Sequence, residues 1–218
     1  PDQEEVTVEV DAILNATGRM PNFDGLNLEA TGLDMESLPA ANDSMQSSVE
    51  HVFLAGDCSG HHQILHTANV EGAIAGRNAA RVAQKLDGGP EGWPENYPDV
   101  EAVFTDPPFA SVGHSIEPLR QAGVKFLHAE KHFSGQGRGI VMGAQHGFIR
   151  LLAEESGTLL GAQILGPRAD DLIHVFSTAI GLGASAQDME RLPWYHPTLC
   201  EAILDVVRDV ASQANSDR

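Results

Sequence analysis

A histidine and a glutamate, five positions apart near the end of the chain, are the residues best suited to chemistry. His196 and Glu201 delimit the segment HPTLCE, which directly precedes a stretch with helical periodicity. An imidazole titrates near neutral pH, and a carboxylate on one ring nitrogen would fix its tautomer and stabilise the imidazolium formed on proton uptake. The pair is therefore a candidate general acid-base centre, of a kind suited to deprotonating a thiol.

The same segment also allows a purely structural interpretation. Thr198 and Glu201 have the spacing of a capping box, in which both side chains satisfy free amides of the first helical turn. On local grounds alone the cap is the better interpretation of Glu201. His196 considered by itself is more often a surface or structural histidine than a catalyst, so the choice depends on the rest of the chain.

A second candidate site lies at the end of the run HVFLAGD, at Gly56 and Asp57. We expect residues 51–57 to form a short buried strand, and ligands usually bind at the ends of such strands. Asp57 could accept hydrogen bonds from sugar-type hydroxyls, although a turn-forming aspartate explains it equally well. A helix expected from about Ile64 to Leu86 would point its positive N-terminal end at a group that gains negative charge.

Two other patterns give weaker signals. His61, His62 and His66 lack cysteine or carboxylate neighbours at familiar ligand spacings, and zinc needs three or four convergent groups, so we expect no metal site. The run GQGRG at 135–139 is not followed by a series of helix formers. We therefore interpret it as a flexible turn rather than a phosphate-binding loop.

The composition is that of an acidic globular protein. Lys and Arg number 13 against 31 Asp and Glu, which gives a net charge of -18, and 42% of residues are apolar. Such a charge repels phosphate backbones and anionic lipid surfaces, so neither nucleic acid nor membrane is an expected partner. Solubility explains the acidic surface better than attraction for a basic partner domain, but both interpretations stand.

Targeting and redox signals point to a soluble protein of a reducing compartment. The sequence has no run of about 18 apolar residues and no signal peptide. Cys58 and Cys200 form neither a CxxC nor a metal-spaced pair, so a disulfide-stabilised secreted domain is not expected. We predict a cytoplasmic location.

The chain divides at a segment rich in Gly, Pro and Trp, residues 87–98. Before it, residues 6–14 alternate and then become continuously apolar, which predicts a strand entering a buried sheet and closed by a turn at Gly18. Because this strand has no preceding element and the chain lacks an initiator methionine, we expect a fragment cut inside a domain.

The second part carries short strand-like runs separated by glycine turns, together with three helical patterns. Antiparallel pairing is the natural inference, and the fold class is α+β: an antiparallel sheet flanked by helices, preceded by a partial α/β segment. Strands are expected at 102–105, 124–129, 147–153 and 159–165, and helices at 115–122, 170–182 and 201–211.

Taken in order, several of these segments resemble the pyridine nucleotide-disulfide oxidoreductases. They are ATGRMPN at 16–22, VFLAGD at 52–57, FTDPPFASVG at 104–113, GTLLGAQILGP at 157–167 and HPTLCE at 196–201. The ordered set is highly specific and covers essentially the whole chain. It corresponds to roughly the C-terminal half of such an enzyme, so the FAD-binding GxGxxG, the CxxxxC redox disulfide and most of the NAD domain would lie outside it.

The resemblance implies roles for both candidate sites. Residues 1–95 would contain the end of the NAD domain followed by the returning FAD segment, and residues 100–218 would be the dimerisation domain. His196, oriented by Glu201, would act as acid-base across a homodimer on substrate held at the partner's disulfide. The residues implied to contact FAD or the nicotinamide nucleotide are Gly18, Gly56, Asp57, Gln63, Ile64, Leu65 and His66.

Within the family the sequence is most similar to the lipoamide dehydrogenases. His196 and the lack of a terminal cysteine pair disfavour mercuric reductases and soluble transhydrogenases, whereas Leu199 and the GAQILGP strand favour lipoamide dehydrogenases over glutathione reductases, which share HPTxxE. Trp194-Tyr195 and His61-His62 depart from the lipoamide dehydrogenase pattern, which leaves the disulfide substrate open.

The implied reaction is oxidation of dihydrolipoamide, held on a carrier domain, with FAD and NAD. The acidic charge also allows a basic subunit-binding domain of a 2-oxo acid dehydrogenase complex as a partner. The alternatives are a glutathione-reductase-like enzyme and a stand-alone dimerisation or scaffold module without chemistry. We expect the fragment alone to be catalytically silent, to dimerise through residues 100–218 and to retain negligible flavin.

Overall fold

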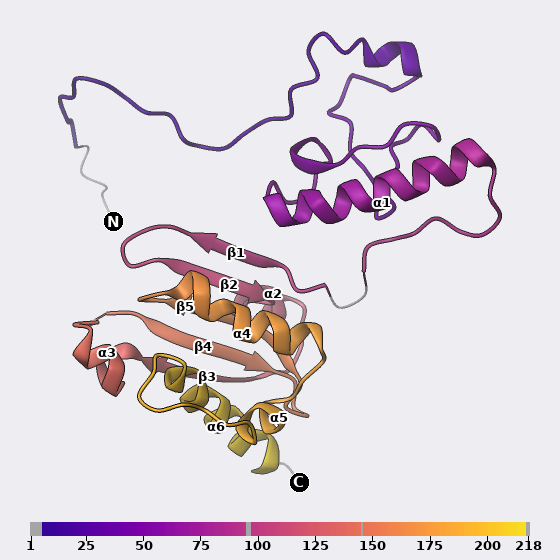
Figure 1. Ribbon diagram of the computed structural model, residues 1–218. Coiled ribbons are helices and arrows are strands. Elements are labelled where there is room, and N and C mark those ends of the chain that lie inside the picture. Colours follow the sequence, from indigo (N-terminus) through magenta and orange to yellow (C-terminus); the bar gives the residue numbers. More distant parts are fainter. Residues whose placement is uncertain (1–5, 95–96, 145, 217–218) are drawn as a thin grey trace. The chain divides into compact units, whose positions relative to one another are not determined.

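A five-stranded antiparallel sheet lies in the second of two units into which the chain divides, residues 1–93 and 94–218 (Figure 1). The computed structural model describes residues 6–94, 97–144 and 146–216. The strand order is β1-β2-β5-β4-β3. In chain order the strands are β1 Val100–Val103, β2 Phe109–Gly113, β3 Leu127–His132, β4 Phe148–Ala153 and β5 Leu159–Leu165.

One face of the sheet is buried beneath two long helices. Helix α4 (Ala169–Gly181) packs on β2 and β5, and helix α6 (Glu201–Ser216) packs on β3 and β4. Because side chains alternate along a strand, every second residue faces these helices. The side chains that join strands and helices in one core include Val112, Ile149, Leu151, Ile164, Ile173, Phe176, Ile203, Val206 and Val210.

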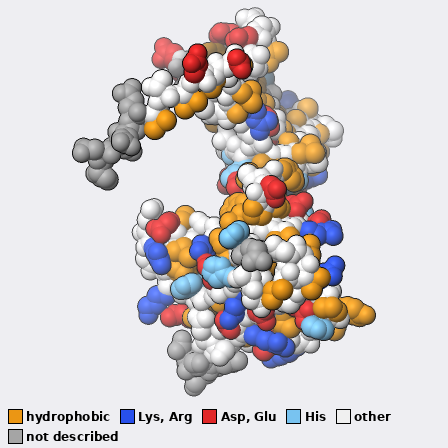
Figure 2. Space-filling view, turned by 90° about the vertical axis from the view of Figure 1, so that its left-hand side faces the viewer, with side chains coloured by type: hydrophobic (Ala, Val, Ile, Leu, Met, Phe, Trp, Pro, Cys, Tyr) orange, Lys and Arg blue, Asp and Glu red, His pale blue; other side chains and the backbone are white. Residues whose placement is uncertain are grey.

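The opposite face of the sheet carries a cluster of polar side chains. Arg150 of β4 donates to the Glu130 carboxylate at 2.6 Å and to the Gln163 amide oxygen at 2.9 Å. These three residues come from neighbouring strands, β3, β4 and β5, at paired positions. The sheet is therefore one-sided, which is the usual arrangement for antiparallel strands with one solvated face. On the face that Figure 2 shows, acidic and basic side chains of this unit are interspersed.

The antiparallel sheet and its flanking helices confirm the fold that the sequence predicts. The four expected strands correspond to β1, β3, β4 and β5, and the three expected helices to α2 (Ile116–Gln121), α4 and α6. Strand β2 was not predicted, because its five residues follow two prolines and contain small side chains. It forms because it pairs with β1 on one side and with β5 on the other.

The expectation of a flexible turn at 135–139 is wrong. A 3-10 helix, η3 (Phe133–Gly135), is followed directly by helix α3 (Gly137–Val141). The Gln136 side chain accepts a hydrogen bond from the Gly139 amide at 2.6 Å and so caps α3. Glutamine is not among the preferred capping residues, which explains why the sequence pattern did not indicate a helix start. A second short helix, α5 (Ala186–Glu190), also escaped prediction.

The first unit is built around helix α1 (Leu65–Gln84), which confirms the helix expected at 64–86. Its inner face buries Ile74 and Ala75 against Met45. Two 3-10 helices, η1 (Leu28–Thr31) and η2 (Gly56–Cys58), are the other helical elements of this unit within its described residues. None of the helices among residues 6–94, 97–144 and 146–216 has the length and apolar character that crossing a membrane requires.

Two strands expected in this unit are absent from the described residues. Residues 6–14 form no strand, and their apolar side chains are exposed, Ile13 at 88% and Leu14 at 90%. Residues 51–57 contribute a single bridge, between Phe53 and Gln46. A strand needs a hydrogen-bonded neighbour, and within the described part of the chain β1–β5 pair only with one another, so the alternating pattern of residues 6–14 has no partner there.

Gly166, in the segment GTLLGAQILGP, allows a core aromatic ring to close the end of the sheet. A Cβ atom at this position would lie 2.3 Å from the Phe133 ring, and the Gly166 φ is 151°. Phe133 is fully buried. The segment therefore has a packing role in addition to its strand, because only glycine leaves room for this ring.

We expect Gly166→Ala to destabilise the chain by about 2–4 kcal/mol, because overpacking adds to backbone strain. The matched control is Gly123→Ala. Gly123 also has a positive φ, 67°, but nothing lies within 4 Å of the place that its added methyl group would take, so only strain of about 1 kcal/mol applies. Urea unfolding followed by circular dichroism measures both, and equal losses would contradict the packing role.

Candidate active site

The two residues predicted to be catalytic meet at the start of the last helix. Glu201 is the first residue of α6, and His196 lies in the loop between α5 and α6. The His196 Nδ1 and Glu201 Oε1 atoms are 2.5 Å apart. The imidazole is 78% exposed and the glutamate side chain 23%. The carboxylate is thus shielded while the ring that it holds stays accessible.

Glu201 acts as a cap and as a partner of His196 at once. Its Oε2 atom accepts from the Thr198 backbone amide at 3.0 Å, whereas Oε1 contacts the imidazole. The Thr198 hydroxyl donates to the Tyr195 carbonyl at 2.8 Å, whereas the Glu201 amide donates to the Thr198 backbone carbonyl at 3.4 Å rather than completing a capping box. One carboxylate oxygen thus makes the contact that the structural interpretation expects and the other makes the contact that the chemical interpretation expects, so the two are compatible.

The carboxylate sets the protonation pattern of the ring. The hydrogen bond from His196 lowers the pKa of Glu201 below its ordinary value, and the bond from the Thr198 amide lowers it further. An ionised carboxylate only accepts hydrogen bonds, so Nδ1 carries the proton between the two groups. In the neutral ring Nε2 is then the nitrogen that can take a proton from a substrate.

Contacts with the core hold this loop just before His196 and between His196 and Glu201. The Trp194 indole donates to the Met189 carbonyl at 3.1 Å, and Leu199 is buried against the sheet. Cys200 is a free cysteine that is partly buried against the same core, where it serves as a small apolar group. The His196–Pro197 peptide bond is cis.

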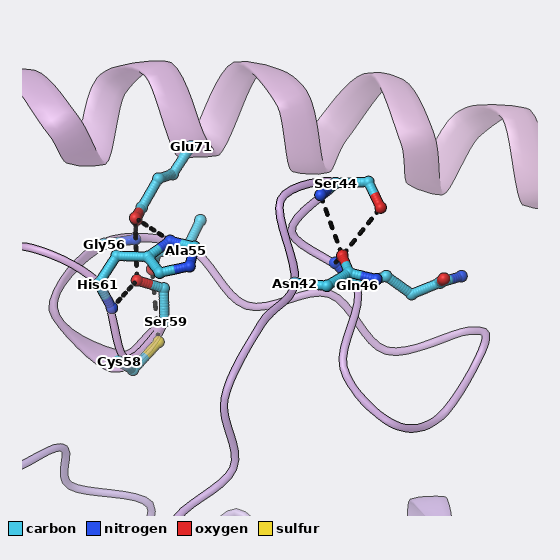
Figure 3. A network of polar contacts seen from close by, with 9 residues as sticks. All are labelled: Asn42, Ser44, Gln46, Ala55, Gly56, Cys58, Ser59, His61 and Glu71. Carbon is cyan, nitrogen blue, oxygen red and sulfur yellow. Dashed lines mark hydrogen bonds and ion pairs between the residues drawn. The ribbon is translucent and has the colours of Figure 1, made fainter. Parts of the chain in front are cut away.

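In the first unit, a buried carboxylate organises the loop that carries the predicted cofactor residues. Glu71 of α1 is fully buried and faces residues 55–61 (Figure 3). It accepts from the Gly56 amide at 2.6 Å and the Ser59 hydroxyl at 2.9 Å, and contacts His61 Nδ1 at 3.0 Å. A second hydrogen-bonded cluster in the same view is centred on Asn42, whose Oδ1 atom accepts from Ser44 and Gln46.

Glu71 was missed in the sequence, although a signal for it exists. The buried face of α1 consists of Thr67, Glu71, Ile74, Ala75 and Asn78, which recur at helical spacing. A carboxylate on such a face needs hydrogen-bond donors, because burying an unpaired charge is costly. The nearby HVFLAGDCSGHH segment supplies those donors.

Several predicted cofactor residues lie together beside α1. The Asp57 carboxylate pairs with Arg19 at 2.7 Å, and Arg19 also donates to the Gln63 carbonyl at 2.7 Å. The Gln63 side chain in turn donates to the Asp57 carbonyl at 3.1 Å. Arg19, which sequence reasoning did not select, thus brings its neighbour Gly18 toward the other two residues.

The remaining predicted residues form the beginning of α1. Ile64 is its N-cap residue and makes no side-chain capping bond. Leu65 is 79% exposed, and the His66 Nε2 atom is buried with no hydrogen-bond partner in the part of the chain that is described. The first helical turn therefore has an unpartnered polar group.

Two family models match the chain. Residues 2–80 match the pyridine nucleotide-disulphide oxidoreductase model, and residues 100–207 match the pyridine nucleotide-disulphide oxidoreductase dimerisation domain. The sequence is 33% identical to a dihydrolipoyl dehydrogenase of Haloferax volcanii over 98% of this chain and 44% of that protein. It is 32% identical to the dihydrolipoyl dehydrogenase of Geobacillus stearothermophilus over 93% of this chain and 42% of that protein.

Solved structures share the fold. LpdA from Mycobacterium tuberculosis matches with a TM-score of 0.71 at 22% identity, over 87% of this chain and 40% of that one. RclA, an HOCl-induced flavoprotein disulfide reductase from Escherichia coli, matches with 0.70 at 20% identity, over 88% of this chain and 44% of that one. The chain thus spans less than half the length of the relatives that it matches.

The Glu71 network predicts which contact protects the loop. Replacing Glu71 with Leu leaves the Gly56 amide without its acceptor, and each buried group left unpaired costs about 1–3 kcal/mol. We expect hydrogen exchange at the Gly56 amide to accelerate at least about tenfold. Asn78→Ala is the control, because Asn78 lies on the same helix face but holds Ser44 and Glu91. Equal acceleration in both variants would contradict a local role.

The lowered pKa of Glu201 predicts a pH-dependent contribution to stability. A carboxylate whose folded pKa is depressed stabilises the fold above its unfolded value, about 4.3, and this stability is lost as the pH falls through the folded value. Glu201→Gln should therefore lower Tm at pH 7, with the difference from the parent shrinking on acidification below about pH 4. Glu117→Gln, which breaks the exposed pair with Arg120, is the control and should change Tm little at either pH.

Proposed function

The chain belongs to the pyridine nucleotide-disulphide oxidoreductase family, and we propose that it supplies the returning FAD segment and the interface domain of a dihydrolipoyl dehydrogenase. The observation that most supports this proposal is the contact between His196 Nδ1 and Glu201 Oε1, 2.5 Å long, at the start of α6. The names of the relatives at 30% identity or more support the choice of dihydrolipoamide over glutathione as the substrate class.

In this proposal His196 moves a proton at the substrate sulfur. Nε2 accepts the proton of a dihydrolipoamide thiol, and the resulting thiolate attacks a redox disulfide held by the partner subunit. Glu201 keeps the ring oriented and stabilises the imidazolium, because its charge lies against Nδ1. The second thiol loses its proton to the cysteine thiolate released in that attack and displaces the remaining cysteine from the mixed disulfide, so that lipoamide leaves as its ring disulfide and the dithiol's two electrons remain on the reduced cysteines.

The residues of the first unit fit a bound flavin dinucleotide. The Asp57 side chain is 51% exposed and offers a carboxylate for ribityl hydroxyls, and Gly56 has a φ of 78°, a backbone conformation that favours glycine just before this aspartate. The buried His66 Nε2 atom without a partner lies in the first turn of α1, where Gln63, Ile64 and Leu65 would line the ring. Gly18 would lie beside the nicotinamide nucleotide. When bound, FAD and NAD would carry the two electrons away from the cysteines.

The proposed assembly is a homodimer formed through residues 100–218, which the match to a dimerisation domain supports. Dihydrolipoamide would arrive on a carrier domain, and a basic subunit-binding domain would suit the net charge of -18. A cytoplasmic location is supported by cysteine usage, because Cys58 and Cys200 are both free.

The decisive test replaces His196 with Gln in the whole flavoprotein. General acid-base catalysis contributes about 100- to 10,000-fold, so we expect kcat for dihydrolipoamide oxidation to fall at least about 100-fold. Oxidation of NADH by an artificial acceptor, which needs no thiol deprotonation, should be unchanged. His114→Gln, at another exposed histidine of the same unit, is the control and should retain turnover. Full turnover in the His196 variant would refute the proposed base.

A further inference from the structure

Gln136 connects α3 to the loop that carries the His196–Glu201 pair. Its side chain is nearly fully buried, and both ends of its amide are used. The Oε1 atom accepts from the Gly139 amide at 2.6 Å, which caps α3, and Nε2 donates to the Thr198 carbonyl at 3.0 Å. A cap needs only the first of these bonds. The second joins segments 62 positions apart.

Thr198 is the centre of the loop, because each of its polar groups has a partner within the site. Its amide donates to Glu201 Oε2 at 3.0 Å, and its hydroxyl donates to the Tyr195 carbonyl at 2.8 Å. Its carbonyl accepts from Gln136 and also from the Glu201 amide, at 3.4 Å. A shift of Thr198 would therefore displace the carboxylate that holds His196.

Gln136 is itself held rigidly by the core. Its backbone amide donates to the Phe133 carbonyl at 3.0 Å, and the Phe133 ring is fully buried. A Cβ atom on Gly139 would lie 2.6 Å from the same Phe133 carbonyl, so α3 approaches this anchor closely. The core therefore fixes the position of Gln136, and the bond from its side-chain amide restrains the loop at Thr198.

We propose that Gln136 is a positioning residue that fixes Thr198, and through it the Glu201 carboxylate, so that His196 keeps the orientation needed for proton transfer. The catalytic consequence rests on the proposed function, whereas the effect on the ring does not. A neutral imidazole has two tautomers, and the carboxylate at Nδ1 selects the one with Nε2 unprotonated. If the carboxylate drifts, the ring regains access to the Nε2–H tautomer and to other rotamers.

The test uses Gln136→Ser in the 218-residue chain. Serine is a preferred capping residue and restores the α3 cap, but it is too short to reach the Thr198 carbonyl. Nitrogen-15 NMR at about pH 9, where imidazoles are neutral, reports the tautomer of His196. We expect the ratio of the Nε2–H to the Nδ1–H form to rise about fivefold, as befits loss of one hydrogen bond. Gln136→Leu, which loses both bonds, should show the same rise.

Gln213→Ser is the matched control. Gln213 also donates from Nε2 to a carbonyl of another element, that of His128 at 3.1 Å, but it lies about three turns along α6 from Glu201. We expect the His196 tautomer ratio in the Gln213→Ser variant to equal that in the parent. An unchanged ratio in Gln136→Ser, or an equal rise in Gln213→Ser, would overturn the proposal.

Turnover by the whole flavoprotein separates this proposal from the proposed function. We expect Gln136→Ser to lower kcat for dihydrolipoamide oxidation about tenfold with KM within about twofold, because only orientation is lost. In a Glu201→Gln background the same substitution should add less than about twofold, since both residues act through one contact. If His196→Gln retains turnover, the proposed function fails while the tautomer result stands. If His196→Gln is inactive and Gln136→Ser has the parent kcat, the positioning role fails.

Discussion

The carboxylate of Glu201 has one oxygen on the imidazole of His196 and the other on the backbone of Thr198, and the candidate active site depends on this division. The first contact selects the tautomer of the ring, and the second fixes the carboxylate to the first turn of α6. Because the glutamate is the first residue of that helix, the chemistry is built into a helix terminus. The glutamate that caps the helix thereby also holds an exposed imidazole.

The rest of the second unit explains why this helix terminus is held in place. Helix α6 buries Ile203, Val206 and Val210 against β3 and β4, so its axis is set by the core. The one-sided sheet leaves that core on a single face, and the glycine at 166 lets Phe133 close it. From Phe133 the chain leads directly to Gln136, which reaches back to the loop before α6. The site is therefore supported from two separate parts of the same core.

In the first unit, too, a carboxylate holds a loop in place, here the carboxylate of Glu71. Glu71 is buried beneath loop 55–61 and accepts hydrogen bonds from its backbone and side chains, so the loop is shaped around a carboxylate (Figure 3). Asp57, the loop's exposed carboxylate, is thereby left at the surface beside Arg19. The buried acid thus shapes the loop, and the exposed one is the acid that the proposed function assigns to ligand binding. Glu201 is less exposed than the His196 ring that it holds, and Glu71 is less exposed than Asp57 of the loop that it shapes.

Local sequence patterns determined the long helices, four of the strands and the candidate residues His196 and Glu201, because periodicity and residue chemistry act over a few positions. They failed where a partner decides the outcome. Residues 6–14 alternate like a strand, yet they pair with no other segment among the residues that the structure describes, and β2 is a strand because β1 and β5 flank it. Thr198–Glu201 spacing could not choose between a cap and an acid-base pair, since both need the same residues. Only the tertiary structure shows that one carboxylate contacts both the Thr198 amide and the His196 ring, because the position of this loop depends on Gln136 and the core, far away in the sequence.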